Sequence, residues 1–209
     1  MDVLDAIRKR RSVRSFESKS IARETIQEIL EAGNWAATGL NQQPWRFVVV
    51  QDPTFISRLL EQAGSKWRRT VERKAGTADQ PTRKYLVDMF ARSFRWPAAG
   101  FETMMSMYVR MDDGVFYGAP AIVFVIGADK GTRNPDCAMV CQNIMLAAYS
   151  FGLGSCWVGS GARITDGPEI VAELDLKDGE KIFGPIAIGY PKGGFPDPPQ
   201  KRPPRVKWI

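Results

Sequence analysis

Basic and hydroxyl side chains near the N-terminus could together bind an anion. Arg10, Arg11, Ser12 and Arg14 stand close together at the end of a short helical pattern. Guanidinium groups donate paired hydrogen bonds to phosphate oxygens, and a serine hydroxyl can add a further donor. A solvated basic helix end would have the same composition, so the motif alone is weak. We treat it as a candidate phosphate site that needs support from the rest of the chain.

A second polar cluster precedes a strand pattern. Thr38 and Gly39 are followed by three consecutive amides, Asn41, Gln42 and Gln43. An amide both donates and accepts hydrogen bonds, which is what the edge of a pyrimidine-like ring requires. An ordinary polar loop is the alternative interpretation.

The composition excludes several kinds of catalytic site. The chain has no histidine, so Ser-His-Asp and Cys-His arrangements and imidazole-dependent zinc sites are absent. Its three cysteines, Cys137, Cys141 and Cys156, lack the further soft ligands that a metal would need. We predict no metal site, and we interpret the cysteines as buried thiols in a reducing, cytoplasmic compartment.

Two further classes of site are not predicted. In segment 152–157, which begins like a dinucleotide fingerprint, Trp157 occupies the place of the third glycine. The longest uncharged stretch, residues 137–162, contains Gln142, Asn143 and four glycines. We interpret it as a buried helix and a turn-rich segment, and we expect no association with a membrane.

The formal net charge of +6 is concentrated in three parts of the chain. Residues 1–14, 66–95 and 200–209 are strongly basic, and the remainder is net negative. Anionic ligands are therefore expected at the two ends and in the middle segment. We predict no nucleic-acid partner, because net negative sequence separates the basic clusters and no nucleic-acid-binding motif is present.

Hydrophobic periodicity predicts the elements that position these residues. A short helix is expected directly after Asp2. The other expected helices cover residues 20–33, 53–63, 85–94, 135–151 and 169–174. The expected strands are residues 45–50, 119–128, 155–160 and 182–190. Ser20 and Asn134 are the expected N-caps of two helices, and Gly184-Pro185 is expected to break the last strand. Strands separated by helices indicate an α/β or α+β sheet domain.

We expect one domain over residues 1–209, because no linker or repeat divides the chain. We expect residues 64–110 to be a variable region or an insertion on the substrate side, and its polar, basic start, residues 64–80, to be a mobile loop or an irregular helical insertion. The tail, residues 191–209, is rich in proline and is expected to lie extended along a surface.

The helix over residues 135–151 is apolar on all sides. Such a helix is unsuited to the surface of a monomer. It could be buried in a homodimer or serve as the central core helix of a monomer, and the helix pattern alone favours neither interpretation.

Four blocks of sequence together resemble the FMN-dependent nitroreductase family. The blocks are Arg10-Arg-Ser-Val-Arg14-Ser-Phe16, Ala36-Ala-Thr-Gly-Leu-Asn-Gln-Gln-Pro-Trp-Arg-Phe-Val-Val-Val50, Gly152-Leu-Gly-Ser-Cys-Trp-Val-Gly159 and Ala187-Ile-Gly-Tyr-Pro191. They occur in the order found in that family and span essentially the whole chain.

The resemblance implies an α+β fold with a mixed central β-sheet flanked by helices. It also implies a homodimer with a helical interface, two FMN molecules at that interface, and a central dimer helix over residues 135–151.

The resemblance further assigns residues to FMN. Arg10 and Ser12, with Arg11 between them, would hold the phosphate and ribityl chain, joined by Lys201 and Arg202 of the tail. Arg14 would lie near N1 and the C2 oxygen of the flavin and tune the ring.

Two other segments would approach the ring. Thr38, Gly39 and Asn41 would reach the flavin from the partner subunit. The backbone N–H groups of Gly159 and Ser160 would approach N5.

The activity implied is an FMN-dependent NAD(P)H oxidoreductase without a catalytic side chain, because the redox chemistry belongs to the cofactor. NADH or NADPH would give a hydride to flavin N5, and a nitroaromatic, quinone or similar acceptor would then be reduced, in a ping-pong cycle.

Two alternatives to this activity stay open. The chain could be a non-catalytic FMN-binding storage or sensor protein, or a flavin enzyme of the same fold that performs reductive dehalogenation or flavin breakdown. The basic, aromatic segment at residues 64–101 would either line the substrate side of the flavin or contribute to the ordinary hydrophobic core. Its aromatic residues are Trp67, Tyr85, Phe90, Phe94, Trp96 and Phe101.

Overall fold

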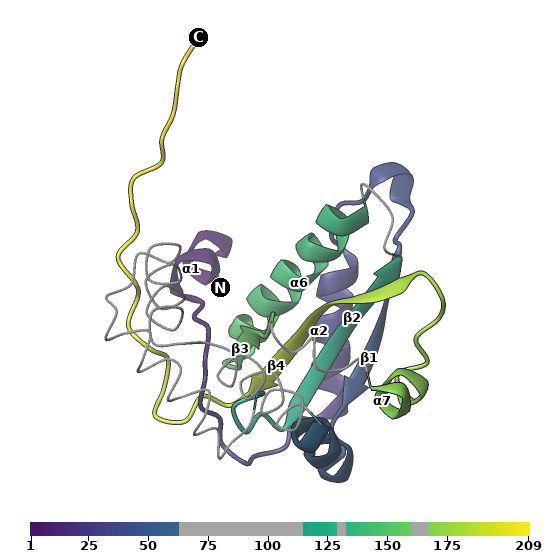
Figure 1. Ribbon diagram of the computed structural model, residues 1–209. Helices are drawn as coiled ribbons and strands as arrows, with labels where there is room; N and C mark the ends of the chain where they lie inside the picture. The colour runs from purple at the N-terminus through teal and green to yellow at the C-terminus, as the bar shows by residue number, and fades with distance from the viewer. Residues whose placement is uncertain (63–114, 129–132, 160–166) are drawn as a thin grey trace, which may run out of the picture.

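A computed structural model describes residues 1–62, 115–128, 133–159 and 167–209 of the chain (Figure 1). The described strands form one sheet in the order β1-β2-β4-β3. They are β1 (Trp45–Val50), β2 (Ala121–Ala128), β3 (Gly154–Trp157) and β4 (Glu180–Gly189), and all neighbours are antiparallel. A parallel bridge between Ser12 and Ser155 adds the N-terminal segment to the β3 edge. The sheet and its flanking helices confirm the predicted α+β class.

Helices cover both faces of the sheet (Figure 1). α2 (Arg23–Asn34) and α6 (Arg133–Ser150) pack on one face, and α7 (Pro168–Glu173) and a helix at residues 53–62 pack on the other. α1 (Val3–Lys9) contacts α6. Val123 and Val125 of β2 pack with α2 and α6, whereas Ile122 and Phe124 pack with helix 53–62 and α7. Alternate side chains of a strand point to opposite faces, so β2 is apolar throughout because both faces are covered.

α6 is a core helix of this chain along one face. Cys141 and Ile144 are fully buried, and Gly33 lets α2 approach closely, since a Cβ there would lie 2.7 Å from Ile144 Cγ1. The opposite face carries Met139, whose side chain is 40% exposed. Packing within one chain therefore accounts for only part of the apolar surface of α6.

β4 contains a bulge rather than a break. Gly184 pairs with Val125 and Ile182 pairs with Ile126, which leaves Phe183 as the extra residue. The strand continues through Gly184-Pro185 to Gly189, so the predicted interruption is wrong. In a β-bulge one residue has no partner on the neighbouring strand, and pairing resumes beyond it. The bulge at Phe183 therefore lets β4 continue through Gly184 and Pro185.

An ion pair ties β1 to β4 and to the end of α7. Arg46 Nη2 donates to Glu180 Oε2 at 2.7 Å, and its Nη1 donates to the Leu174 carbonyl at 3.2 Å. The hydrogen bond from Arg46 is the main cause that lowers the pKa of Glu180 to about 2.

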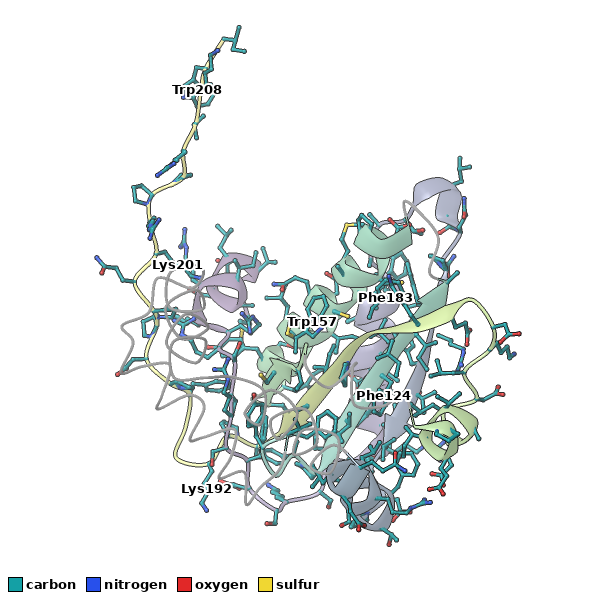
Figure 2. The ribbon with its side chains drawn as sticks, in the orientation of Figure 1. Phe124, Trp157, Phe183, Lys192, Lys201 and Trp208 are labelled. Atoms are coloured by element: carbon teal, nitrogen blue, oxygen red, sulfur yellow. The ribbon has the colours of Figure 1, made fainter. Side chains whose placement is uncertain are left out.

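The N-terminal segment and the start of the tail run together beside the sheet edge. Glu17 N donates to the Tyr190 carbonyl at 2.9 Å, and Lys192 N donates to the Ser15 carbonyl at 3.1 Å. Farther along the tail, Phe195 packs edge to face on Tyr149 of the helix at residues 133–150, with ring centroids 4.9 Å apart. Beyond Phe195 the tail leaves the body of the protein, and Trp208 is 91% exposed (Figures 1 and 2). The end of the tail does not lie along the surface of the described part of its own chain.

Ser20 is not a helix N-cap. α2 begins at Arg23 with Ala22 in the N-cap position, because Ile21 is buried in the core and Gln51 Nε2 donates to its carbonyl at 2.9 Å, which holds the preceding chain extended.

Other predicted boundaries also shift. α6 begins at Arg133, so Asn134 lies inside the helix rather than capping it. α2 runs through Gly33 to Asn34, and β3 covers only Gly154–Trp157 of the expected 155–160.

The predicted helix at residues 85–94, the 64–110 region and its aromatic residues lie outside the described residues. Within the described part of the chain, no helix combines the length and the apolarity that crossing a membrane requires.

Candidate functional site

Arg10 ends α1 and carries a guanidinium nitrogen with no partner. Its backbone N–H bonds the Ala6 carbonyl at 2.9 Å, which fixes the residue at the C-terminal end of the helix. Its Nη1 is buried and makes no hydrogen bond. Burial, followed by repulsion from Arg11, lowers the pKa of Arg10. A half-buried cation with one unpaired, buried nitrogen is costly, and an anion at the same place would offset the cost.

Arg11 is held by carbonyl groups and also keeps one free donor. Its Nη1 donates to the Arg8 and Arg10 carbonyls at 2.6 and 2.7 Å, while its Nε is buried without a partner. Asp5 on the same helix pairs with Lys9 at 3.1 Å instead. Among the residues that the structure describes, no carboxylate pairs with Arg10, Arg11 or Arg14.

The chain after Arg11 lies against β3. Val13 N donates to the Ser155 carbonyl at 3.0 Å, beside the parallel bridge between Ser12 and Ser155. Gly154 is required for this contact, since a Cβ there would lie 2.6 Å from Val13 Cγ2. The sheet edge thus determines where the arginines lie.

Ser155 contributes a further unsatisfied group. The residue is 1% exposed, and its Oγ has no hydrogen-bond partner. Bridged residues point to the same face of a sheet, so the side chains of Ser12 and Ser155 lie on one side of the β3 edge. Sequence reasoning did not select Ser155, and the only signal was a polar residue in the otherwise apolar run from Leu153 to Val158.

Cys156 points to the opposite face and does not provide a nucleophile. Burial raises the pKa of its thiol, and the charges of Arg14 and Arg10 only partly oppose this effect. The thiol belongs to the core cluster that contains Phe124. A buried thiol with a raised pKa is unreactive at neutral pH.

We call the group formed by Arg10, Arg11, Ser12, Arg14 and Ser155 the arginine cradle. It presents buried donors and positive charge, and no carboxylate of the described residues pairs with it. These residues fit a phosphate-bearing ligand such as FMN, because a phosphate supplies the acceptors and the negative charge that Arg10 Nη1 and Arg11 Nε lack.

The predicted loop residues lie far from the cradle within one chain. Thr38 Oγ1 donates to Asp136 Oδ2 in the first turn of α6 at 3.1 Å, and Gly39 and Asn41 form the adjacent short turn η1 (Gly39–Asn41). The cradle lies toward the other end of this helix, where residues 151–153 turn into β3 (Figure 1). The 18 residues of α6 are about 27 Å long, so one chain does not bring the two sets together.

The remaining predicted residues are placed as follows. Gly159 is exposed just beyond β3, with open space where a Cβ would stand. Lys201 and Arg202 are exposed in the tail, and Figure 2 shows Lys201 between Lys192 and Trp208. Ser160 lies outside the described residues.

Comparison with known proteins identifies the family of this chain. The sequence model of the Nitroreductase family matches residues 7–190. A protein of Archaeoglobus fulgidus named as a NADH dehydrogenase/NAD(P)H nitroreductase is 25% identical over 193 residues, which cover 91% of this chain and 86% of that protein.

Solved structures give the same result. A nitroreductase with bound FMN from Bacteroides fragilis superposes with a TM-score of 0.72 at 25% identity, covering 100% of this chain and 98% of the other. A variant of the FMN and NADPH-dependent nitroreductase NfnB from a Sphigopyxis species superposes with a TM-score of 0.70 at 25% identity, covering 100% and 99%.

The chain therefore belongs to the nitroreductase family. The resemblance inferred from the four sequence blocks is confirmed.

Proposed function

We propose that this chain is an FMN-dependent oxidoreductase that uses NADH or NADPH to reduce a nitroaromatic, quinone or similar acceptor. The observation that carries the proposal is the arginine cradle, where Arg10 Nη1 and Arg11 Nε are buried and have no hydrogen-bond acceptor among the described residues. Relatives named for FMN and for NAD(P)H support the choice of cofactor and donor.

The chain's own residues bind and orient the cofactor. Arg10 and Arg11, with Ser12 beside them, hold the phosphate, and Lys201 and Arg202 add charge from the tail. Arg14 places a positive charge beside the ring and favours its anionic reduced form. When bound, FMN supplies the redox chemistry, in which donor and acceptor react in two separate half-reactions. No protein side chain needs to act as an acid or base.

We further propose that two copies of the chain complete each site. The loop residues Thr38, Gly39 and Asn41 are separated from the cradle by the length of α6, so they reach a ring held at the cradle only from a second copy. Exposed apolar side chains support such an interface: Val3, Leu4, Ile7, Leu40 and Met139.

An open cavity on the surface also supports an interface with a second copy of the chain. It has a volume of about 360 Å³, lies between α1, α2 and α6, and includes Leu146 and Ala147 in its lining. It contains no residue of the arginine cradle. We interpret it as part of the surface that the second copy covers.

We also propose that residues 1–209 form a single domain and that the protein is cytoplasmic. The location is supported by Cys137, Cys141 and Cys156, which are all free and buried thiols.

The test is reconstitution of the purified protein with FMN, followed by anaerobic stopped-flow reduction with NADH and with NADPH and then a panel of acceptors. We expect a yellow holoprotein that is reduced by at least one nicotinamide and reoxidised by an acceptor. Protein that stays colourless would overturn the proposal. Flavin binding without reduction would indicate a storage or sensor protein instead.

A further inference from the structure

Trp157 at the end of β3 presents a fixed, partly exposed indole. The side chain is 36% exposed, yet its Nε1 donates to the Phe183 carbonyl at 3.1 Å. Phe183 is the bulged residue of β4, so the ladder between β2 and β4 gives it no partner. Gly184 leaves room for the indole, because a Cβ there would lie 2.8 Å from Trp157 Nε1. The bulge and the glycine together set the orientation of the ring, and Figure 2 shows Trp157 beside Phe183.

The indole lies on the same face of the sheet edge as the hydroxyl groups of the arginine cradle. Cys156 points into the core on the opposite face, so its neighbours Ser155 and Trp157 both point toward the α6 side. Two residues along a strand separate them by about 7 Å. Ser12 is bridged to Ser155 and points to this side as well.

We propose that the exposed face of the Trp157 indole contacts the flavin ring of FMN bound at the arginine cradle. The proposal rests on the function proposed above and adds a residue that the sequence did not assign. The indole N–H is already satisfied within the chain, so the remaining exposed surface is apolar and aromatic. Such a surface suits a planar ring and not a charged or strongly hydrated group. Since the orientation exists before the ligand binds, little rotamer freedom is lost on binding.

The test compares two flavins and two kinds of variant. FMN and riboflavin share the ring, but riboflavin lacks the phosphate. We expect Trp157→Leu to weaken the binding of both flavins by about tenfold, as the loss of one aromatic contact implies. Trp157→Phe keeps a planar ring and should retain most of the affinity. Arg10→Ala should weaken FMN and leave riboflavin unchanged. Dissociation constants come from titration of the apoprotein, with visible circular dichroism of the bound flavin as a second readout.

A matched control separates flavin contact from general destabilisation. Leu174→Ala removes a buried side chain at the end of α7. Figure 1 shows α7 near β1, the edge strand opposite β3. It should lower the melting temperature of the apoprotein without changing either dissociation constant.

Three outcomes would count against the proposal in different ways. If the wild-type protein binds neither flavin, the proposed function fails and this inference fails with it. If wild type and Trp157→Leu bind both flavins equally, only the role of Trp157 is overturned. A change in dimer dissociation with unchanged flavin affinity would also overturn it, and would place the indole against the second copy.

Discussion

The backbone N–H of Val13 donates to the Ser155 carbonyl at 3.0 Å and joins the arginine-bearing segment to the β3 edge. Through this contact the position of the arginine cradle depends on how closely Val13 can approach Gly154. The candidate site is therefore a property of the sheet edge as well as of the basic motif.

Replacing Gly154 by alanine should displace this segment. The new Cβ would lie 2.6 Å from Val13 Cγ2, and overpacking of a buried contact costs about 1–3 kcal/mol. We expect a lower melting temperature and weaker FMN binding. Gly39→Ala is the control for stability, because nothing lies within 4 Å of its Cβ position. Equal melting temperatures for the two variants would contradict the close contact with Val13.

Arg10→Ala should affect the holoprotein more than the apoprotein. It removes a buried Nη1 that has no partner, so we expect the free energy of unfolding of the apoprotein to change by less than about 1 kcal/mol. The stabilisation that added FMN confers should fall sharply, since ligand binding to the native state raises stability by mass action. Thermal melts with and without FMN measure both quantities. Arg8→Ala, an exposed residue of α1, is the matched control and should match wild type in both melts.

The ion pair between Arg46 and Glu180 should make stability fall in acid. The pKa of Glu180 is lowered from 4.5 to about 2 in the folded state. The pair therefore contributes fully above about pH 4.5, and its contribution is lost as the pH falls toward 2. Glu180→Gln should lower the free energy of unfolding by about 1–3 kcal/mol at pH 7 and flatten its decline below pH 4.5, as denaturant titrations would show.

The exposed pair between Arg58 and Glu173 provides the comparison. Glu173→Gln should cost less than about 1 kcal/mol at pH 7, because solvent screens an exposed pair. A larger loss for Glu173→Gln than for Glu180→Gln would contradict the role given to the Arg46 pair.

Mixing two variants tests whether a site is shared between two copies. Arg10→Ala impairs the cradle and Asn41→Ala impairs the loop, so each variant alone should bind FMN weakly. A heterodimer made from both contains one intact site, and a fully exchanged equal mixture should regain about a quarter of the wild-type sites. Equilibrium dialysis of the refolded mixture counts them. No recovery would mean that the loop serves the cradle of its own chain.

Much of the architecture could be predicted from local sequence because its causes are local. The β-branched and aromatic run from Trp45 to Val50 forms β1, and the apolar run after Pro120 forms β2. The helix boundary at Ser20 could not be predicted, because burial of Ile21 and its hydrogen bond from Gln51 involve a distant strand. The bulge at Phe183 was missed for the same reason, since register depends on the partner strand.

The sequence by itself determined which chemistry this protein can perform. The absence of histidine, the basic motif around Arg10 and the four blocks already indicated a flavoprotein of the nitroreductase family, because residue types carry charge and hydrogen-bonding capacity wherever they lie. Only the tertiary structure decided which groups are left unpaired. The unpaired Arg10 Nη1, Arg11 Nε and Ser155 Oγ, and the orientation of Trp157 beside Gly184, depend on how separate segments of the chain pack together. Desolvation and orientation depend on such contacts and are not properties of a residue type.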